Sequence, residues 1–563
     1  MHQPFPQQQA SWLKDILLIT LVLGGLYFIL LGSRPLFVPD EGRYAEIARE
    51  MVARGDYVTP FLNGVKYFEK PVLFYWLESF AIHLGGLNLW AIRSVNALLG
   101  LLGCLATYGT VRSLYDRATG LLAAFILGTS TLYFVMTHMI TLDLPVTLFL
   151  ALTLYCFLLG VNSATPVRAY LWAAAVFAAG AMLTKGLIGI VFPAMIIALW
   201  IALLGKWRLL LRIYLPSCLL IFFILTLPWH LLVQWRHPEF FYFYFIKQHF
   251  LRYTMLKIGH YQPVWFFIPA FIIGFFPWIV FLPQALAKTI TDIWRDRHEH
   301  AKELFFFLWA ILIFIFFSVS KSKLIPYILP VFPPFAILTA RYLRLAIQQK
   351  YTRGTTAGLI FLFFASLLTG YICLYFPRHN VLPDPQHAIL LLTSAASILV
   401  AGTILTGYFY RQLRKAIIIL IATAALFLLM TFASMPAIDT RSILPIANRL
   451  NHVLMPQDEV VVYNQYYQDL PFYLQRQITI LNWKNELTYG MQHQDVRDWM
   501  VNDLTFWKRW HSHKHVYALM GKDEYKKFMV KHPHERHYII METINNILIS
   551  NQIYSASQVN TRK

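Results

Sequence analysis

Long apolar stretches separated by polar loops are the feature that most constrains the fold of this chain. A helix rises about 1.5 Å per residue, so crossing the apolar core of a bilayer takes about 20 residues. The chain is 58% hydrophobic and 13% charged, whereas soluble domains are about one quarter charged. We predict a polytopic α-helical membrane protein with about 13 transmembrane helices. They are expected at 14–32, 89–111, 118–136, 144–160, 168–183, 187–204, 213–232, 264–286, 303–319, 324–340, 355–375, 388–408 and 416–434.

Two apolar segments near the amino terminus each have more than one possible role. The first, at 16–32, is followed by no small-residue cleavage site, so we expect a retained helix rather than a signal peptide. The second, at 71–87, is short, starts with Pro71 and carries Glu78 and His83. If it does not span, the more basic loops share one side, which the positive-inside rule makes cytoplasmic. We therefore predict an interfacial or re-entrant helix there, a cytoplasmic amino terminus and a periplasmic carboxyl terminus.

The chain is expected to have two parts. Residues 1–434 form the membrane domain, with structured outer loops at 33–88 and 234–263, and residues 435–563 form a soluble α/β domain. Within the first loop, the apolar spacing over Glu41 to Arg54 predicts a helix. In the soluble domain we predict strands near 458–463, 478–481 and 515–520 and a helix at 523–530.

Charge and cysteine usage exclude other classes. The net charge of +20 comes from basic residues scattered through loops, so we expect membrane lipids as partners and no nucleic acid. The four cysteines all lie inside apolar runs, with neither a disulfide framework nor a metal-binding spacing.

Acidic residues at the borders of the apolar stretches are the first candidates for chemistry, because ionisable groups there are costly. Asp40 and Glu41 follow the first stretch, and Asp143 precedes the fourth. The structural alternative is that Asp40 and Asp143 only cap the helices that follow them. Cations on the same predicted side would complement these acids at a phosphate-bearing substrate, or serve topology and headgroup binding alone. They are Arg43, Lys70, Arg252, Lys257, Lys321 and Lys323.

The first outer loop also carries a recognisable series of motifs. They are the runs 39–51 (PDEGRYAEIAREM), 55–60 (GDYVTP), 62–64 (LNG) and 67–71 (YFEKP). Further matches are 141–143 (TLD), 249–252 (HFLR) with His260, and 322–330 (SKLIPYILP). This series resembles bacterial 4-amino-4-deoxy-L-arabinose lipid A transferases, which are grouped with protein O-mannosyltransferases among the GT-C glycosyltransferases. The chain departs from the family at Phe61, where arginine is usual.

The resemblance implies a site and a reaction. The reaction would move the amino sugar from undecaprenyl phosphate to a lipid A phosphate at the periplasmic face of the inner membrane. Asp40 would be the principal catalytic carboxylate, with Asp143 and Glu41 beside it. Lys70, Arg252, Arg43 and Lys323 would meet the carrier phosphate. Tyr44, Tyr67, Glu69, Tyr327, His249 and His260 would line the substrate pocket.

Cofactor and function leave alternatives open. No cofactor is expected to be required, but Glu69, His249 and His260 offer the carboxylate and imidazole ligands that suit zinc. A protein O-mannosyltransferase-like enzyme would share the acidic loop and use a protein hydroxyl as acceptor. A lipid transporter or flippase is the alternative from another class, although the sequence lacks the paired, interrupted helices of two related halves.

Overall fold

The structure is a computed structural model that describes residues 6–163, 165–251, 261–348 and 353–553, without the side chains of 6–10 and 249–250. The chain divides into two compact units. The first unit comprises Met1–Ser33, Glu69–Phe74 and Arg93–Met435. The second comprises Arg34–Phe68, Tyr75–Ile92 and Pro436–Lys563. The first outer loop, which we predict as part of the membrane domain, therefore groups mostly with the carboxyl-terminal residues.

The first unit is helical. Its helices up to residue 236 are α1 (Pro6–Ile19), η1 (Thr20–Gly24), α2 (Gly25–Phe28), most of α5 (Leu89–Leu114), α6 (Arg117–Gly128), α7 (Thr131–Thr137), α8 (Asp143–Val161), α9 (Arg168–Lys185), α10 (Ile188–Leu203), η2 (Trp207–Leu211) and α11 (Leu215–Arg236). Those that follow are η3 (Tyr242–Leu251), η4 (Val264–Phe266), α13 (Phe267–Gly274), η5 (Trp278–Phe281), α14 (Leu282–Arg295), α15 (Ala301–Val319), η6 (Ile325–Val331), α16 (Phe332–Gln348), α17 (Arg353–His379), α18 (Pro385–Tyr408) and α19 (Leu413–Ala433).

The number of membrane-spanning helices is close to the prediction. Among the described residues, nine helices are long and apolar enough to cross a membrane, or up to eleven if each of two bent pairs is one span. The bent pairs are Arg117–Gly128 with Thr131–Thr137 and Val264–Gly274 with Trp278–Arg295. The remaining two of our thirteen segments are helices as well, α9 with 18 residues and α10 with 16. The prediction of about thirteen spans exceeds the count because these two helices are short or less apolar.

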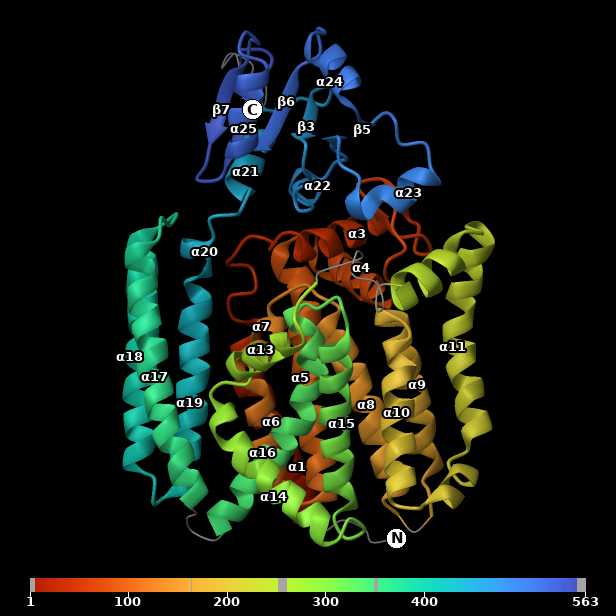
Figure 1. Ribbon diagram of the computed structural model, residues 1–563, viewed down its shortest axis with the longest axis vertical. Helices are drawn as coiled ribbons and strands as arrows, with labels where there is room; N and C mark the ends of the chain where they lie inside the picture. Colours follow the sequence, from red (N-terminus) through yellow and green to blue (C-terminus); the bar gives the residue numbers. More distant parts are fainter. Residues whose placement is uncertain (1–5, 164, 252–260, 349–352, 554–563) are drawn as a thin grey trace. The chain divides into compact units, whose positions relative to one another are not determined.

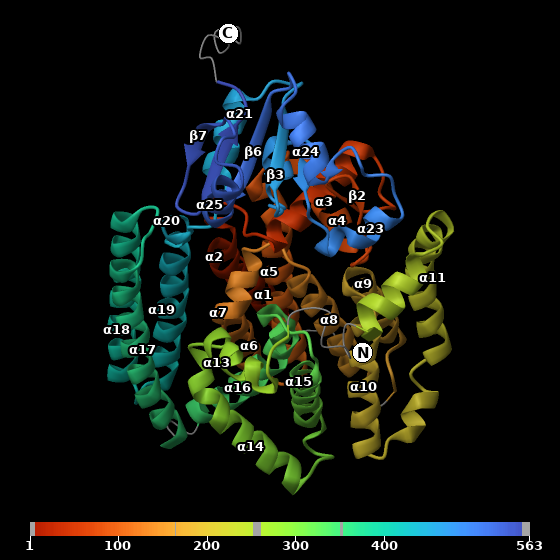
Figure 2. The ribbon, with the colours of Figure 1, turned by 45° about the horizontal axis from the view of Figure 1, so that its top comes forward.

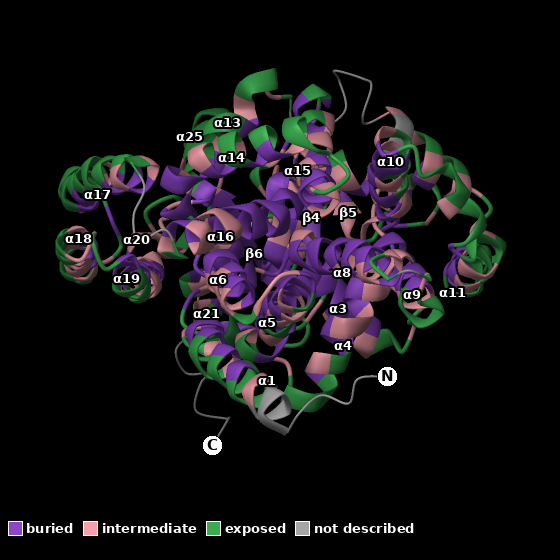
Figure 3. Cartoon of the chain, turned by 90° about the horizontal axis from the view of Figure 1, so that it is seen from below, coloured by how far each residue is buried: buried purple, intermediate pink, exposed green. Residues whose placement is uncertain are grey.

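Burial separates the central helices of this unit from its periphery. In α8, 72% of an 18-residue apolar stretch is buried, whereas 22% of the corresponding stretch of α17 is buried. The helices α17, α18 and α19 lie side by side in both Figure 1 and Figure 2, and Figure 3 shows much of α17 and α18 exposed. Apolar side chains on such a face suit a lipid environment. Most residues of helix α8 are instead buried, and this packing restricts the position of its first residue, Asp143.

The second unit contains a six-stranded sheet of order β5-β4-β3-β6-β8-β7. Its strands are β3 (Glu459–Tyr463), β4 (Thr479–Leu481), β5 (Met500–Val501), β6 (Val516–Gly521), β7 (Tyr538–Glu542) and β8 (Asn546–Ser550). Strands β5, β4, β3 and β6 are parallel, while β8 and β7 are antiparallel additions. All five residues of β3 are buried, as expected of a central parallel strand. The helices around the sheet are α21 (Leu444–Val453), α22 (Leu470–Leu474), η7 (Asn485–Leu487), α23 (Thr488–Gln492), α24 (Asp503–Trp510) and α25 (Lys522–Lys531).

The first outer loop supplies α3 (Asp40–Arg54), a hairpin of β1 (Phe61–Leu62) and β2 (Val65–Lys66), and α4 (Leu73–Gly85). The predicted helix over 41–54 is thus confirmed. At 13 residues, α4 is not among the helices long enough to span a membrane, as expected for the 71–87 segment.

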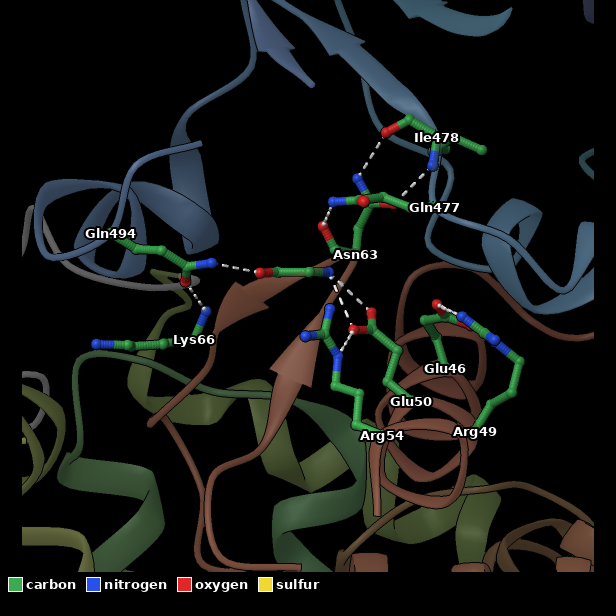
Figure 4. Close-up of polar contacts among 10 residues, drawn as sticks. Glu46, Arg49, Glu50, Arg54, Asn63, Lys66, Gln477, Ile478 and Gln494 are labelled. Atoms are coloured by element: carbon green, nitrogen blue, oxygen red, sulfur yellow. Dashed lines mark hydrogen bonds and ion pairs between the residues drawn. The ribbon is translucent and has the colours of Figure 1, made fainter. Parts of the chain in front are cut away.

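Hydrogen bonds join the hairpin to the carboxyl-terminal part of the same unit (Figure 4). The side-chain amide of Asn63 donates to the carbonyl of Ile478 at 3.0 Å, and the N–H of Ile478 donates back to Asn63 Oδ1 at 3.0 Å. Gln494 bonds Gly64 O at 2.8 Å and accepts from Lys66 N at 3.2 Å. The carboxylate of Glu50 accepts from Gly64 N at 2.9 Å and pairs with Arg54. These bonds fix the hairpin next to the helix that carries Asp40.

Candidate active site

Asp40 and Glu41 are adjacent in sequence but occupy different environments. The side chain of Asp40 is 35% exposed and pairs with Arg43 at 3.2 Å. Glu41 is fully buried, pairs with Arg34 at 2.6 Å and accepts from Phe37 N at 2.8 Å. Asp40 is therefore the carboxylate that a substrate can reach, whereas Glu41 fastens the segment entering α3.

The capping alternative for the two aspartates is not what the structure shows. Helix α3 begins at Asp40 itself with Pro39 at the N-cap, and α8 begins at Asp143 with Leu142 at the N-cap. Neither aspartate makes a side-chain capping bond in these helices, all of whose residues are described. Both carboxylates still lie in a first helical turn, where the macrodipole favours negative charge.

Arg43 joins Asp40 to the carboxyl-terminal part of the second unit. Its guanidinium also pairs with Glu486 at 2.5 Å, and Glu486 accepts from Gln468 at 2.7 Å. Its Cζ lies 5.9 Å from the centre of the Tyr44 ring. Arg43 thus pairs with two carboxylates at once, and this arrangement holds the Asp40 side chain in place.

Buried acids surround α3 in a way that the sequence did not suggest. Glu78 and Asp469 are both fully buried, and none of their carboxylate oxygens has a hydrogen-bond partner among the described residues. Burial, with Glu41 as a further cause, raises the pKa of Glu78 well above its usual range. Burial raises the pKa of Asp469 to about 8, and the pKa of Glu46 to about 8 despite its ion pair with Arg49. Asp469 is therefore mostly protonated at neutral pH, and burial favours the uncharged form of Glu78.

In the first unit, Asp143 forms an ion pair with Lys185, the last residue of α9. The two side chains are 13% and 11% exposed. The Lys185 ammonium lies 4.4 Å from the centre of the Tyr327 ring, which η6 supplies. A carboxylate, an ammonium and a phenol from three helices thus converge at one end of α8, and this set can bind a polar group that carries either charge.

Lys323, predicted at the carrier phosphate, is engaged with the backbone. Only 2% of the residue is exposed, and its ammonium donates to Gln262 O at 2.7 Å and to Ser320 O. Burial, with Lys321 as a second cause, lowers its pKa. Lys323 therefore ties the segment before η6 to residue 262, and through that segment supports Tyr327.

The other predicted site residues fall in three groups. Tyr44 and Tyr67 are buried in the second unit, with the Tyr44 ring 6.2 Å from that of Tyr75. Glu69 and Lys70 are half-buried and belong to the first unit. Arg252, Lys257 and His260 lie outside the described residues, as does the side chain of His249, whose backbone is in η3.

A metal site was weighed on Glu69, His249 and His260. Among the residues that the structure describes, no group of three or more His, Cys, Asp or Glu side chains has an arrangement that could hold a metal ion. Only Glu69 of the three candidates has a described side chain. The zinc alternative therefore stays a prediction.

Sequence reasoning missed Lys185, Glu486, Glu78 and Asp469 as parts of these clusters. Lys185 stands 42 residues from Asp143, and Glu486 stands far beyond the predicted membrane domain. One usable signal existed for Lys185, which ends a helix immediately before Gly186 on the side predicted for Asp143. No comparable signal marks Asp469.

Similar proteins extend over both units. Residues 13–244 match the family model described as dolichyl-phosphate-mannose-protein mannosyltransferase, and residues 446–551 match the aminoarabinose transferase C-terminal domain. The undecaprenyl phosphate-alpha-4-amino-4-deoxy-L-arabinose arabinosyl transferase of Yersinia enterocolitica is 33% identical over 400 residues, 69% of this chain and 71% of that protein. The protein of the same name from Pectobacterium atrosepticum is 30% identical over 511 residues, 87% of this chain and 88% of that protein.

A solved structure agrees with these relatives. The crystal structure of ArnT from Cupriavidus metallidurans bound to undecaprenyl phosphate matches with a TM-score of 0.85 at 27% identity, covering 95% of this chain and 98% of that chain. Its apo state matches with a TM-score of 0.84. This chain therefore belongs to the family of undecaprenyl phosphate-α-4-amino-4-deoxy-L-arabinose arabinosyl transferases, which are membrane-embedded glycosyltransferases of the GT-C type.

Proposed function

We propose that this glycosyltransferase moves 4-amino-4-deoxy-L-arabinose from undecaprenyl phosphate to a phosphate group of lipid A at the periplasmic face of a bacterial inner membrane. The observation that carries the proposal is the extent of the similarity. The mannosyltransferase model covers only residues 13–244, which a protein-glycosylating enzyme would share. The aminoarabinose transferase C-terminal domain at 446–551 favours the lipid A reaction over protein O-mannosylation.

The reaction exchanges one phosphate for another at the anomeric carbon. The bond from this carbon to the carrier phosphate breaks, and a bond to an oxygen of the lipid A phosphate forms. A phosphate monoester has a second pKa of about 6, so the acceptor is mostly a dianion at neutral pH. The leaving undecaprenyl phosphate takes over that charge, and no net proton transfer is needed. The enzyme must therefore position two phosphates and stabilise charge, rather than supply a strong base.

Asp40 and Asp143 suit that task. Asp40 is 35% exposed and already a carboxylate partner of a guanidinium, so it is available to the sugar ammonium or to positive charge developing at the anomeric carbon. Asp143 is held by Lys185, which fixes the direction of its second oxygen. In this proposal Asp40 and Asp143 contact the sugar, Lys185 positions Asp143, and Glu41 and Arg34 position the start of α3.

Fixed cations would meet the leaving phosphate. Lys70 and Arg252 take this role in the proposal, while Arg43 pairs with Glu486 and Lys323 donates to backbone carbonyls. Tyr44, Tyr67, Glu69, Tyr327, His249 and His260 are assigned to the substrate pocket. No metal is required, since the acceptor is ionised without one.

The consequence would be electrostatic. An added ammonium group cancels negative charge on lipid A and weakens the attraction of cationic peptides such as polymyxin. The proposal therefore includes resistance to such peptides.

The test is mass spectrometry of lipid A from cells that make the donor lipid and lack their own transferase. Wild-type chain is expected to add the mass of one pentosamine per modified phosphate, and Asp40→Asn to add none at equal membrane abundance. If neither chain changes lipid A while periplasmic proteins gain sugar, the acceptor is a protein hydroxyl and the proposal is wrong.

A further inference from the structure

The first unit contains an apolar pocket whose lining includes none of the residues assigned to the reaction. It has a volume of about 300 Å³ and is lined by α8, α9, α10, η2 and α11. Its lining includes Phe157, Leu171, Ile190 and Phe222, and no charged side chain. A water-excluding cavity of this composition takes a hydrocarbon chain rather than a polar ligand.

Most of the lining lies in the halves of these helices away from Asp143, and Ile190, near the start of α10, extends it toward Lys185. From α8 it takes Thr153 and Phe157, which lie about 15 to 21 Å along the helix from Asp143 at 1.5 Å per residue. From α9 it takes residues 171–178, near the start of the helix whose far end, Lys185, pairs with Asp143. The helices α8 to α11 turn back on one another (Figure 1), and the segment between α10 and α11 adds Leu210 and Ile213 to the lining.

Contacts between α9 and the start of α11 lie beside this lining. Trp172 Nε1 donates to Ser217 Oγ at 2.9 Å, and Cys218 Sγ lies 3.5 Å from Leu171 O. The guanidinium of Arg168 stacks 4.1 Å above the Trp172 ring and lies 5.5 Å from the Tyr214 ring. These contacts place a cation and two aromatic rings beside the apolar lining, as in a membrane interface.

The stretch of chain that carries most of this lining is basic. No aspartate or glutamate occurs between Asp143 and Glu239, whereas Arg168, Lys206, Arg208 and Arg212 all occur there. These four side chains are exposed, and none makes an ion pair with any residue that the structure describes. Arg208 and Arg212 flank Leu210 and Ile213, which line the pocket on η2 and just after it. Charge that the protein leaves unmatched beside an apolar pocket is complementary to an anionic lipid.

We propose that this pocket binds an anionic glycerophospholipid of the leaflet opposite to Asp143. One acyl chain occupies the cavity, and the phosphate lies among Arg168, Arg208 and Arg212. Basic pockets between transmembrane helices bind anionic headgroups in this way. The bound lipid would hold α9, α10 and α11 together behind the Asp143–Lys185 pair.

Native mass spectrometry of the full-length protein tests the proposal. The protein is released from vesicles of phosphatidylglycerol with phosphatidylcholine, and the retained lipid is identified by mass. We expect phosphatidylglycerol to be retained at least fivefold above its share of the vesicle. The double variant R208Q/R212Q should lose this enrichment. The control R411Q/R414Q removes the same charge from the exposed residues around the start of α19 and should keep the enrichment.

A second variant tests the cavity itself. Ala194 lines the pocket from α10 and is exposed, so Ala194→Phe fills part of the pocket without disturbing the buried core. It should displace the lipid, whereas Ala401→Phe on the exposed face of α18 should not. Retention of phosphatidylcholine in proportion to its share would show ordinary annular lipid, and a retained mass of a polyprenyl phosphate would show a carrier site. Either result, or equal enrichment in all variants, overturns the proposal.

Discussion

The ammonium of Lys185 pairs with Asp143 Oδ1 while it lies 4.4 Å from the centre of the Tyr327 ring. The pair joins the end of α9 to the beginning of α8, two helices that meet because the chain turns back after residue 161. With its side chain only 13% exposed, Asp143 has limited solvation of its charge. Lys185 therefore supplies most of the stabilisation of this carboxylate that the described residues show.

Replacing Lys185 should impair transfer without removing the site. We expect Lys185→Met to lower kcat by about 10²-fold, the size of effect expected when a catalytic group is displaced by about 1 Å. Lys185→Arg keeps the charge and should recover most of the rate. The measurement is single-turnover transfer with purified donor lipid, with KM determined separately. A Lys185→Arg rate as low as that of Lys185→Met would mean that Lys185 does not act through the charge of Asp143.

Substitutions at Asp40 and Glu41 should differ in their effects on activity and on stability. Asp40→Asn is expected to abolish transfer with an unchanged melting temperature, because its side chain is partly exposed. Glu41→Gln leaves the buried Arg34 without its partner, and breaking such a pair costs about 3–5 kcal/mol. The second variant should therefore melt lower. Thermal unfolding by intrinsic fluorescence, paired with lipid A analysis, distinguishes them; loss of activity in Glu41→Gln at full stability would place Glu41 in the chemistry.

The sequence predicted the elements that depend on the local spacing of apolar residues. The apolar spacing over residues 41–54 gave α3, and the runs at 458–463, 478–481 and 515–520 are β3, β4 and β6. Strands β5, β7 and β8 were not predicted. Strand β5 has only two residues, and β7 is an edge strand with largely exposed residues and an irregular register against β8. Strand β8 is buried, but only three consecutive apolar residues, Ile547 to Ile549, mark it in the sequence. The partners of Asp143 and Arg43 come from tertiary packing, and no spacing in the sequence encodes them. The burial of Glu78 and Asp469 likewise depends on which helices cover them.

Raised pKa values in the second unit predict a loss of stability at alkaline pH. Asp469 has a pKa of about 8 in the fold, whereas an unfolded aspartate has its ordinary value near 4. Between these two values the folded state binds more protons, so the free energy of unfolding falls as pH rises and levels off above pH 8. Glu78 and Glu46 shift in the same direction.

The isosteric change Asp469→Asn isolates this effect. The variant removes the proton linkage of one group, so its melting temperature should exceed that of the wild type by a few degrees at pH 9, and the difference should vanish near pH 4. Unfolding of the full-length protein in detergent, followed at five pH values from 5 to 9, gives the comparison. Asp495→Asn is the control, because Asp495 is exposed and its pKa lies near 2, held down by Arg497. Parallel curves for wild type and Asp469→Asn would contradict the buried protonated state.

The hairpin residue Asn63 should be needed for the integrity of the second unit. Its backbone has a φ of +50°, and its buried side chain both donates to and accepts from Ile478. Asn63→Gly tolerates this φ and removes only the two hydrogen bonds, which should destabilise the unit by about 1–3 kcal/mol, since the Ile478 N–H and C=O lose their partners. Asn63→Ala adds backbone strain and should be worse. Hydrogen exchange at residues 478–481 measures the effect directly, with Asn502→Gly, at the cap of α24, as the comparison. We expect faster exchange at 478–481 in both Asn63 variants and not in Asn502→Gly, because the hydrogen bonds to Ile478, directly before strand β4, come from Asn63 of the first outer loop.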